Sequence, residues 1–112
     1  MLIDNSKGVL TPIIYLAAFG SLRRGDIAGL REKDISRDML TVTVSGDMVL
    51  SSGGWVYKDI PKTQGSRRTI QLPRFIIDSI PAKDNPDAFI FDLTPAAITD
   101  RFRRLAEKLQ LP

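Results

Sequence analysis

The sequence predicts an α+β fold with two N-terminal helices, a three-stranded antiparallel sheet and C-terminal helices. Three observations carry this prediction: a mostly apolar stretch follows Thr11-Pro12, apolar and polar residues alternate from Met39, and a second Thr-Pro pair stands at Thr94-Pro95. Threonine before proline marks a helix start, because its hydroxyl can cap the helix and proline suits the first turn. A chain of 112 residues can bury a core of its own, so residues 1–112 are expected to form one domain.

The two N-terminal helices are predicted to meet at a corner. The first follows Thr11 and ends near Gly20. Ser21 can cap a second helix, which is expected to run from about Leu22 to Leu30. A glycine and a serine between two short helices indicate a sharp change of direction at this point.

The alternating region is predicted to form the sheet. Strands are expected at 40–45, at 55–60 and at 67–72, because apolar and polar residues alternate there. The turn residues 51–54 separate the first two strands, and 63–66 separate the last two. The expected pairing is therefore an antiparallel meander, in which strands consecutive in sequence are neighbours.

The C-terminal part is predicted to be helical. A short buried helix is expected from Phe75 to Ile80, followed by a polar loop at 81–87 and a brief extended segment at 88–91. A last helix should begin after Thr94, with a basic outer face and an apolar stripe at spacings of four, three and four residues. The stripe consists of Ile98, Phe102, Leu105 and Leu109.

The composition excludes several classes of chemistry. The sequence has no histidine and no cysteine, so it cannot form a catalytic triad, a thiol nucleophile, a disulfide or a conventional zinc site. Only a hard cation could bind, on Glu32, Asp34 and Asp38, and neither a metal nor a cofactor is predicted. No apolar run approaches the roughly 20 residues that span a bilayer, and the first residues do not resemble a signal peptide. We expect a cytoplasmic protein without a membrane partner.

The charge permits nucleic acid as a partner. The formal net charge is +3, and the strongest local excess lies in the middle third of the chain. It comes from Lys58, Lys62, Arg67 and Arg68, whose nearest acidic residue is Asp59. Such an excess is compatible with DNA but does not by itself select it.

Two short motifs are more specific. The first reads Gly-Ser-Leu-Arg-Arg-Gly-Asp around Arg23 and continues through Leu-Arg-Glu-Lys-Asp-Ile into the predicted sheet. The second reads Lys-Thr-Gln-Gly-Ser-Arg-Arg-Thr-Ile-Gln-Leu-Pro and begins at Lys62. Together they resemble the catalytic domain of tyrosine recombinases, the phage integrase family. Ser21 stands where that family usually has glycine, and Asp26 where it usually has glutamate. The resemblance covers roughly residues 10–110.

The resemblance implies roles for five residues. In the family a tyrosine attacks a DNA phosphodiester, and two arginines stabilise the charge on its oxygens. Arg23 matches the first arginine, and Lys62 matches the lysine that gives a proton to the departing 5′ oxygen. Asp26 follows Arg23 by one turn and is placed to orient its guanidinium. Arg67 and Arg68 are candidates for contacts to DNA phosphates.

Each of these roles has an alternative. Arg23 could be an exposed arginine that only pairs with Asp26, and Lys62 could be an ordinary turn lysine, with Lys58 as a competitor. Arg67 and Arg68 could form a solvated strand edge that prevents pairing with another chain.

The sequence lacks the family's remaining catalytic groups: a His-x-x-Arg segment, a further His or Trp, and the nucleophilic tyrosine. Tyr15 and Tyr57 are interpreted as packing residues, so we expect part of a catalytic domain that binds double-stranded DNA without cutting it. The alternative is a non-enzymatic domain that binds the DNA backbone or is structural. Self-association is also expected, through apolar surface left uncovered by truncation, with Tyr15, Phe19 or Phe102 at the contact.

Overall fold

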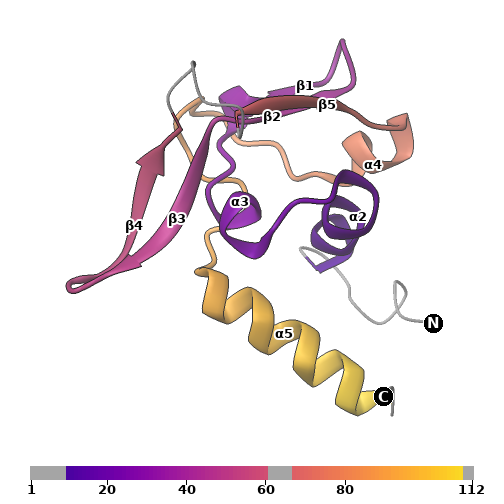
Figure 1. Ribbon diagram of the computed structural model, residues 1–112. Helices are drawn as coiled ribbons and strands as arrows, with labels where there is room; N and C mark the ends of the chain where they lie inside the picture. Colours follow the sequence, from indigo (N-terminus) through magenta and orange to yellow (C-terminus); the bar gives the residue numbers. More distant parts are fainter. Residues whose placement is uncertain (1–9, 61–66, 110–112) are drawn as a thin grey trace.

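A computed structural model describes residues 10–60 and 67–109 of the chain. Its helices are α2 (Leu10–Gly20), α3 (Arg24–Ala28), α4 (Arg74–Ser79) and α5 (Pro95–Lys108), with a 3-10 turn η1 at Glu32–Asp34. Its strands are β1 (Ile35–Ser36), β2 (Thr41–Val44), β3 (Gly46–Ser51), β4 (Gly54–Asp59) and β5 (Arg68–Gln71). Figure 1 shows a small sheet above α2 and α3, the β3–β4 hairpin projecting to the left, and α5 leading away below. The predicted α+β class is confirmed.

The pairing of the strands corrects the predicted meander. The three-stranded antiparallel sheet has the order β1-β2-β5, and β3 and β4 form a separate two-stranded hairpin. Residues 55–59 therefore pair with residues 46–50, and not with the strand at 68–71. A two-residue turn at Ser52 and Gly53 closes the hairpin, and Gly54 adopts a φ of 115° there. Pairing across so short a turn costs little loop entropy, which favours it over the longer connection.

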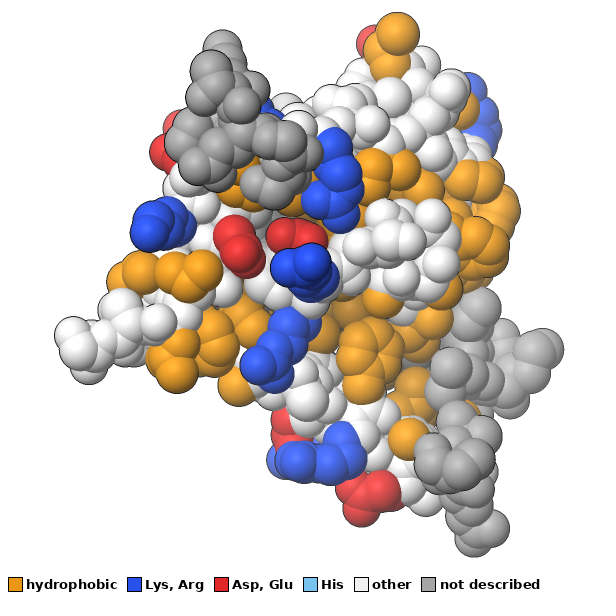
Figure 2. All heavy atoms as spheres, viewed as in Figure 1, with side chains coloured by type: hydrophobic (Ala, Val, Ile, Leu, Met, Phe, Trp, Pro, Cys, Tyr) orange, Lys and Arg blue, Asp and Glu red, His pale blue; other side chains and the backbone are white. Residues whose placement is uncertain are grey.

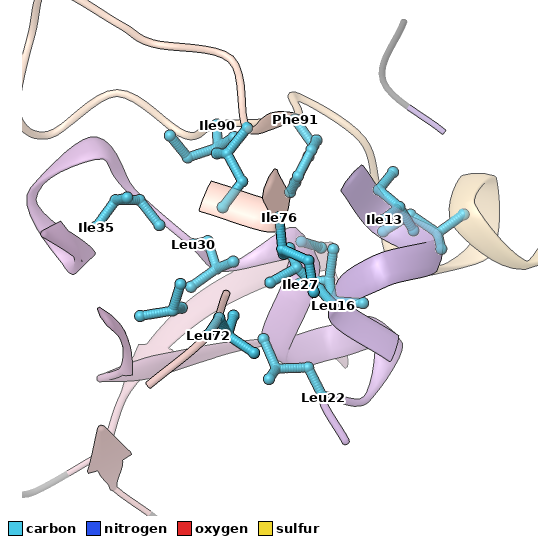
Figure 3. Packing of buried hydrophobic residues seen from close by; sticks show 14 of the residues in the cluster. Ile13, Leu16, Leu22, Ile27, Leu30, Ile35, Leu72, Ile76, Ile90 and Phe91 are labelled. Atoms are coloured by element: carbon cyan, nitrogen blue, oxygen red, sulfur yellow. The ribbon is translucent and has the colours of Figure 1, made fainter. Parts of the chain in front are cut away.

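The core lies between the sheet and the helices. Val42 and Val44 of β2 are fully buried, as their alternation predicts, while Thr41 and Thr43 between them are half-buried. Figure 3 shows side chains from α2, α3 and α4 converging on residues of the sheet and of the segment before α5. The labelled members are Ile13, Leu16, Leu22, Ile27, Leu30, Ile35, Leu72, Ile76, Ile90 and Phe91.

The helix ends agree with the sequence in one case and differ in another. At α5 the Thr94 hydroxyl accepts a hydrogen bond from the Ala97 N–H at 3.1 Å, so the predicted cap is confirmed. At α3 the predicted Ser21 cap is wrong, because Ser21 has a φ of 55° and the helix starts only at Arg24. The Asp26 carboxylate caps this helix instead, by accepting the Arg23 N–H at 3.0 Å. No helix within residues 10–60 or 67–109 is long and apolar enough to cross a bilayer.

Arg37 fastens the end of α4 to the rest of the fold. Its guanidinium donates to the carbonyl oxygens of Ile77, Ile80 and Pro81 at 3.3–3.4 Å. It also donates to the Glu32 carboxylate at 3.2 Å. The last carbonyls of a helix lack partners within the helix, so this arginine satisfies groups that would otherwise be unpaired.

Candidate functional site

The first part of the site is the corner between α2 and α3. The chain turns at Ser21 in the left-handed region, and Arg23, two residues later, is exposed and has extended backbone angles. Gly20 is buried, and a Cβ atom there would approach the Leu22 Cδ1 to 2.9 Å. The packing of Leu22 into the core thus fixes the position from which the Arg23 side chain leaves the surface.

Arg68 joins this corner from the sheet. Asp26 is only 7% exposed, and its Oδ2 lies 3.9 Å from a guanidinium nitrogen of Arg68. The same nitrogen of Arg68 is 3.4 Å from the Ser21 carbonyl oxygen, to which it donates. The structure therefore brings three of the predicted residues together: Arg23, Asp26 and Arg68. Arg68 partly neutralises Asp26 at this corner, and the exposed Arg23 adds a second positive charge beside it.

Asp26 supports Arg23 through the backbone. Its carboxylate binds the Arg23 N–H and lies near Arg68, so it holds the main chain that carries the Arg23 side chain. The predicted orientation of the Arg23 guanidinium by Asp26 stays a prediction.

Lys62 lies outside the described residues, but both ends of its segment are described. The Ile60 N–H donates to the Ser45 carbonyl at 2.9 Å, and the half-buried Arg67 donates to the Ile60 carbonyl at 3.1 Å. Arg67 therefore joins the two ends of the 61–66 segment. β5 is an edge strand, as the alternative interpretation of Arg67 and Arg68 requires, although Arg68 also reaches across to Ser21.

An open groove of about 400 Å³ extends from the corner to the β3–β4 hairpin. Arg24 lies on one side, where it donates to the Thr99 hydroxyl of α5 at 2.8 Å. A Cβ atom on Gly25 would come within 2.3 Å of the Asp47 Oδ1 and 3.0 Å of the Met48 carbonyl oxygen, so glycine favours the close approach of α3 to β3. Figure 2 shows charged side chains down the middle of this face, beside hydrophobic surface over the hairpin. The lining residues are Arg23, Arg24, Gly25, Asp47, Met48, Val49, Leu50, Trp55 and Pro95.

Asp47 carries the acidic group of the groove. Its pKa is raised above the usual 3.8, first because the carboxyl is partly buried and then because Asp26 is close. A hydrogen bond from the Met48 backbone and the charge of Arg23 act in the opposite direction. No sequence signal selected Asp47, because only the approach of the hairpin to α3 places it here.

A cluster around Arg31 attaches the hairpin to the body. The Arg31 guanidinium carbon lies 4.0 Å from the centre of the Tyr57 ring and 5.0 Å from that of the Phe89 ring. Beneath it, the Asp34 carboxylate accepts the Arg31 N–H at 3.0 Å and the Ser45 hydroxyl at 2.6 Å. The interpretation of Tyr57 as a packing residue is confirmed. Sequence reasoning missed Arg31, although its place three residues before an aspartate was a signal.

The fold of this chain is similar to that of solved structures of a transposon integrase, so the fold implied by the resemblance in the sequence is confirmed. The most informative neighbours are structures of the Tn1549 transposon integrase. In complex with circular intermediate DNA, one matches with a TM-score of 0.76 at 20% identity, over 97% of this chain and 43% of that chain. Another, in complex with transposon right end DNA, matches with a TM-score of 0.70 at 20% identity, over 96% of this chain and 42% of that chain.

A third structure of the same integrase, also with a circular intermediate DNA, has a TM-score of 0.75 at 18% identity and covers 97% of this chain. The chain thus spans less than half of the integrase chain in each of these three structures. No family model and no curated protein matches the sequence. At these identities the comparisons establish the fold.

Proposed function

We propose that this chain is part of the catalytic domain of a site-specific DNA recombinase, and that its Arg23 corner binds a phosphate of the DNA strand. The observation that supports this most is the exposed Arg23 beside the Asp26–Arg68 pair, on a fold shared with an integrase over 97% of the chain. Phage or another mobile element is the proposed origin, and double-stranded DNA the proposed partner.

The chemistry of strand exchange explains why arginine suits this corner. Attack on a phosphodiester builds negative charge on the non-bridging oxygens, and a guanidinium remains protonated and offers two parallel donors to them. In this proposal Arg23 binds those oxygens, Asp26 holds the backbone of Arg23, and Lys62 gives a proton to the departing 5′ oxygen. Arg68 and Arg67 contact neighbouring phosphates along the strand.

The isolated 112 residues are proposed to bind DNA without cutting it. Both tyrosines are occupied in packing: Tyr15 lies edge-on to Phe75 at 5.3 Å, and Tyr57 packs under Arg31. A nicked duplex that traps covalent intermediates should therefore give no protein–DNA adduct that resists denaturation. An adduct abolished by Tyr15→Phe or Tyr57→Phe would contradict this proposal.

Duplex binding tests the Arg23 corner directly. Fluorescence anisotropy of a labelled duplex should show weak binding that falls steeply with salt, because phosphate contacts release counterions. Arg23→Ala should weaken binding and reduce the slope of log K against log salt by about 0.9, the contribution of one phosphate contact. Lys83→Ala is the matched control, since it removes an exposed cation in the 81–87 loop. Equal losses from both variants, or none from Arg23→Ala, would refute the phosphate role.

The full reading frame that encodes this chain distinguishes two hypotheses, a recombinase and a non-enzymatic DNA-binding domain. A frame that continues into His-x-x-Arg and a tyrosine supports strand exchange. A frame without them favours backbone binding alone, even if Arg23 is required for it.

Self-association is proposed to involve an aromatic cluster on α2 and α4. Phe19 and Phe75 are 60% and 54% exposed, and both rings contact the half-buried Tyr15. Exposed apolar surface of this kind commonly marks a contact with another protein. Phe102, the third residue named from the sequence, is half-buried and packs against the core. Sedimentation at increasing concentration should show association that Phe19→Ser weakens, and a monomer at all concentrations would contradict it.

A further inference from the structure

Trp55 lines two hollows of the surface. It lines the groove that contains Arg23, and it also lines a smaller pocket of about 250 Å³ beside Phe89 and Leu93. Trp55 pairs with Leu50 across the hairpin and is itself only half-buried. An indole with hollows beside it offers ring surface to a flat ligand.

The groove combines three chemistries in one space. Arg23 and Arg24 supply positive charge at the α3 side, and Arg24 is held in place by its bond to Thr99. Trp55 supplies an aromatic surface, and Asp47 supplies a hydrogen-bond acceptor. A volume of about 400 Å³ lies within the usual range of small-ligand sites.

A nucleotide has the matching parts. Its phosphate suits the guanidinium groups, its base has a flat face that stacks on aromatic rings, and the amino groups of adenine, cytosine and guanine can donate to a carboxylate. In a paired duplex both faces of each base are covered by its neighbours. Only a base that has left the stack can therefore meet Trp55.

We infer that this groove holds an unpaired nucleotide of the DNA strand, with its phosphate on Arg23 and its base stacked on Trp55. The inference rests on the proposed function and adds a subsite to it. Asp47 lines the groove beside Gly25 and near Arg23, where its carboxylate can accept a hydrogen bond from an amino group of the base. Thymine, which lacks an amino group, should bind less well than adenine or cytosine at this subsite.

The experiment compares a fully paired DNA duplex with the same duplex carrying one bulged adenine. Trp55 is the only tryptophan of the chain, so quenching of its fluorescence reports stacking on that ring. The bulged DNA should quench Trp55 more strongly and bind about 5- to 150-fold more tightly, which corresponds to the usual contribution of one stacked base. A bulged thymine should give a smaller gain.

Variants in the hairpin supply the controls. By anisotropy, Trp55→Leu should abolish the preference for the bulge, whereas Trp55→Phe should keep part of it. Val56→Ala should leave the preference unchanged, because Val56 is exposed and lines neither hollow. Retained preference in Trp55→Phe shows that the loss in Trp55→Leu is not a folding defect.

The possible failures are distinguishable. If the paired and bulged duplexes bind equally, or if Trp55→Leu keeps the preference, the nucleotide subsite is wrong. Arg23-dependent binding of the paired duplex would still support the proposed function in that case. If neither DNA binds, both the proposed function and the subsite are refuted.

Discussion

The two sheets of this molecule are held in different ways. In the β1-β2-β5 sheet the inward side chains of β2, Val42 and Val44, are fully buried in the apolar core. In the β3–β4 hairpin, Leu50 is 68% exposed and Val56 is 44% exposed. The hairpin is attached mainly at its base, where Tyr57 lies under the Arg31 guanidinium and against Phe89.

This difference separates a rigid body from an attached arm. The apolar side chains of the core sheet pack in one cluster with those of α2 and α4. Loss of one of these side chains should therefore lower the stability of the whole body. The hairpin depends on the packing of β3 against α3 and on the aromatic and cation–π contacts around Arg31, which are individually weak. The Arg23 corner belongs to the body, while Trp55 and Asp47 of the groove belong to the arm.

The largest expected effect comes from the core. Ile76→Ala in α4 should lower the free energy of unfolding by about 2–5 kcal/mol, because Ile76 is fully buried and its loss leaves a cavity. Leu50→Ala in the hairpin should change it by about 0.5 kcal/mol or less, since Leu50 is exposed. Denaturant titration followed by circular dichroism measures both values. Similar losses in the two variants would remove the distinction between body and arm.

A smaller and more local effect is expected at the attachment of the arm. Arg31→Ala removes the guanidinium that contacts Tyr57 and Phe89. This should lower the free energy of local opening of the hairpin by about 1–2 kcal/mol. Hydrogen exchange should then be about 5- to 30-fold faster for amides of β3 and β4 and unchanged for β2 and β5. Equal acceleration in both sheets would show that Arg31 supports the whole fold.

The smallest effect concerns pH. Burial raises the pKa of Tyr57 above 10.0, as do Asp34 and Asp59, against the effects of Ser45 and Arg31. The neutral phenol is therefore favoured in the folded state. The contribution of the neutral phenol to the free energy of unfolding is complete below pH 10 and is lost as pH rises through the pKa of the folded state. Chemical denaturation measures the free energy of unfolding between pH 9 and about pH 11. That free energy should fall less in Tyr57→Phe than in the unaltered chain, and identical pH profiles would exclude the contribution of Tyr57.

Much of the fold could be predicted because its signals are local. The α5 start depends on Thr94 and Pro95 alone, and its inward residues Ile98 and Leu105 are buried as their spacing predicts. The alternation around Val42 likewise predicted which side chains face the core. Strand pairing could not be predicted in the same way, because alternation identifies strands but not their partners.

In the candidate site too, residues close together in sequence could be predicted, and residues brought together by packing could not. Arg23 and Asp26 lie three residues apart in one motif, so the sequence was sufficient to select them. The approach of Arg68 to Ser21 joins residues 47 positions apart and depends on the packing of the sheet against the helices. Trp55 enters the groove only because the hairpin leans on α3 at Gly25. A glycine at that point was a signal of close approach, but nothing local named the strand that approaches.

Ser21 has a consequence for how Arg23 is held before any ligand arrives. Its φ of 55° lies in the left-handed region, which glycine enters freely and serine enters only at some cost. Glycine at this position would gain freedom in the unfolded chain that it must lose on folding. Serine restricts that freedom, and its carbonyl oxygen is also fixed by Arg68. The entropy cost of ordering this backbone is therefore met when the chain folds. A phosphate that bound at the corner would not have to order the backbone itself.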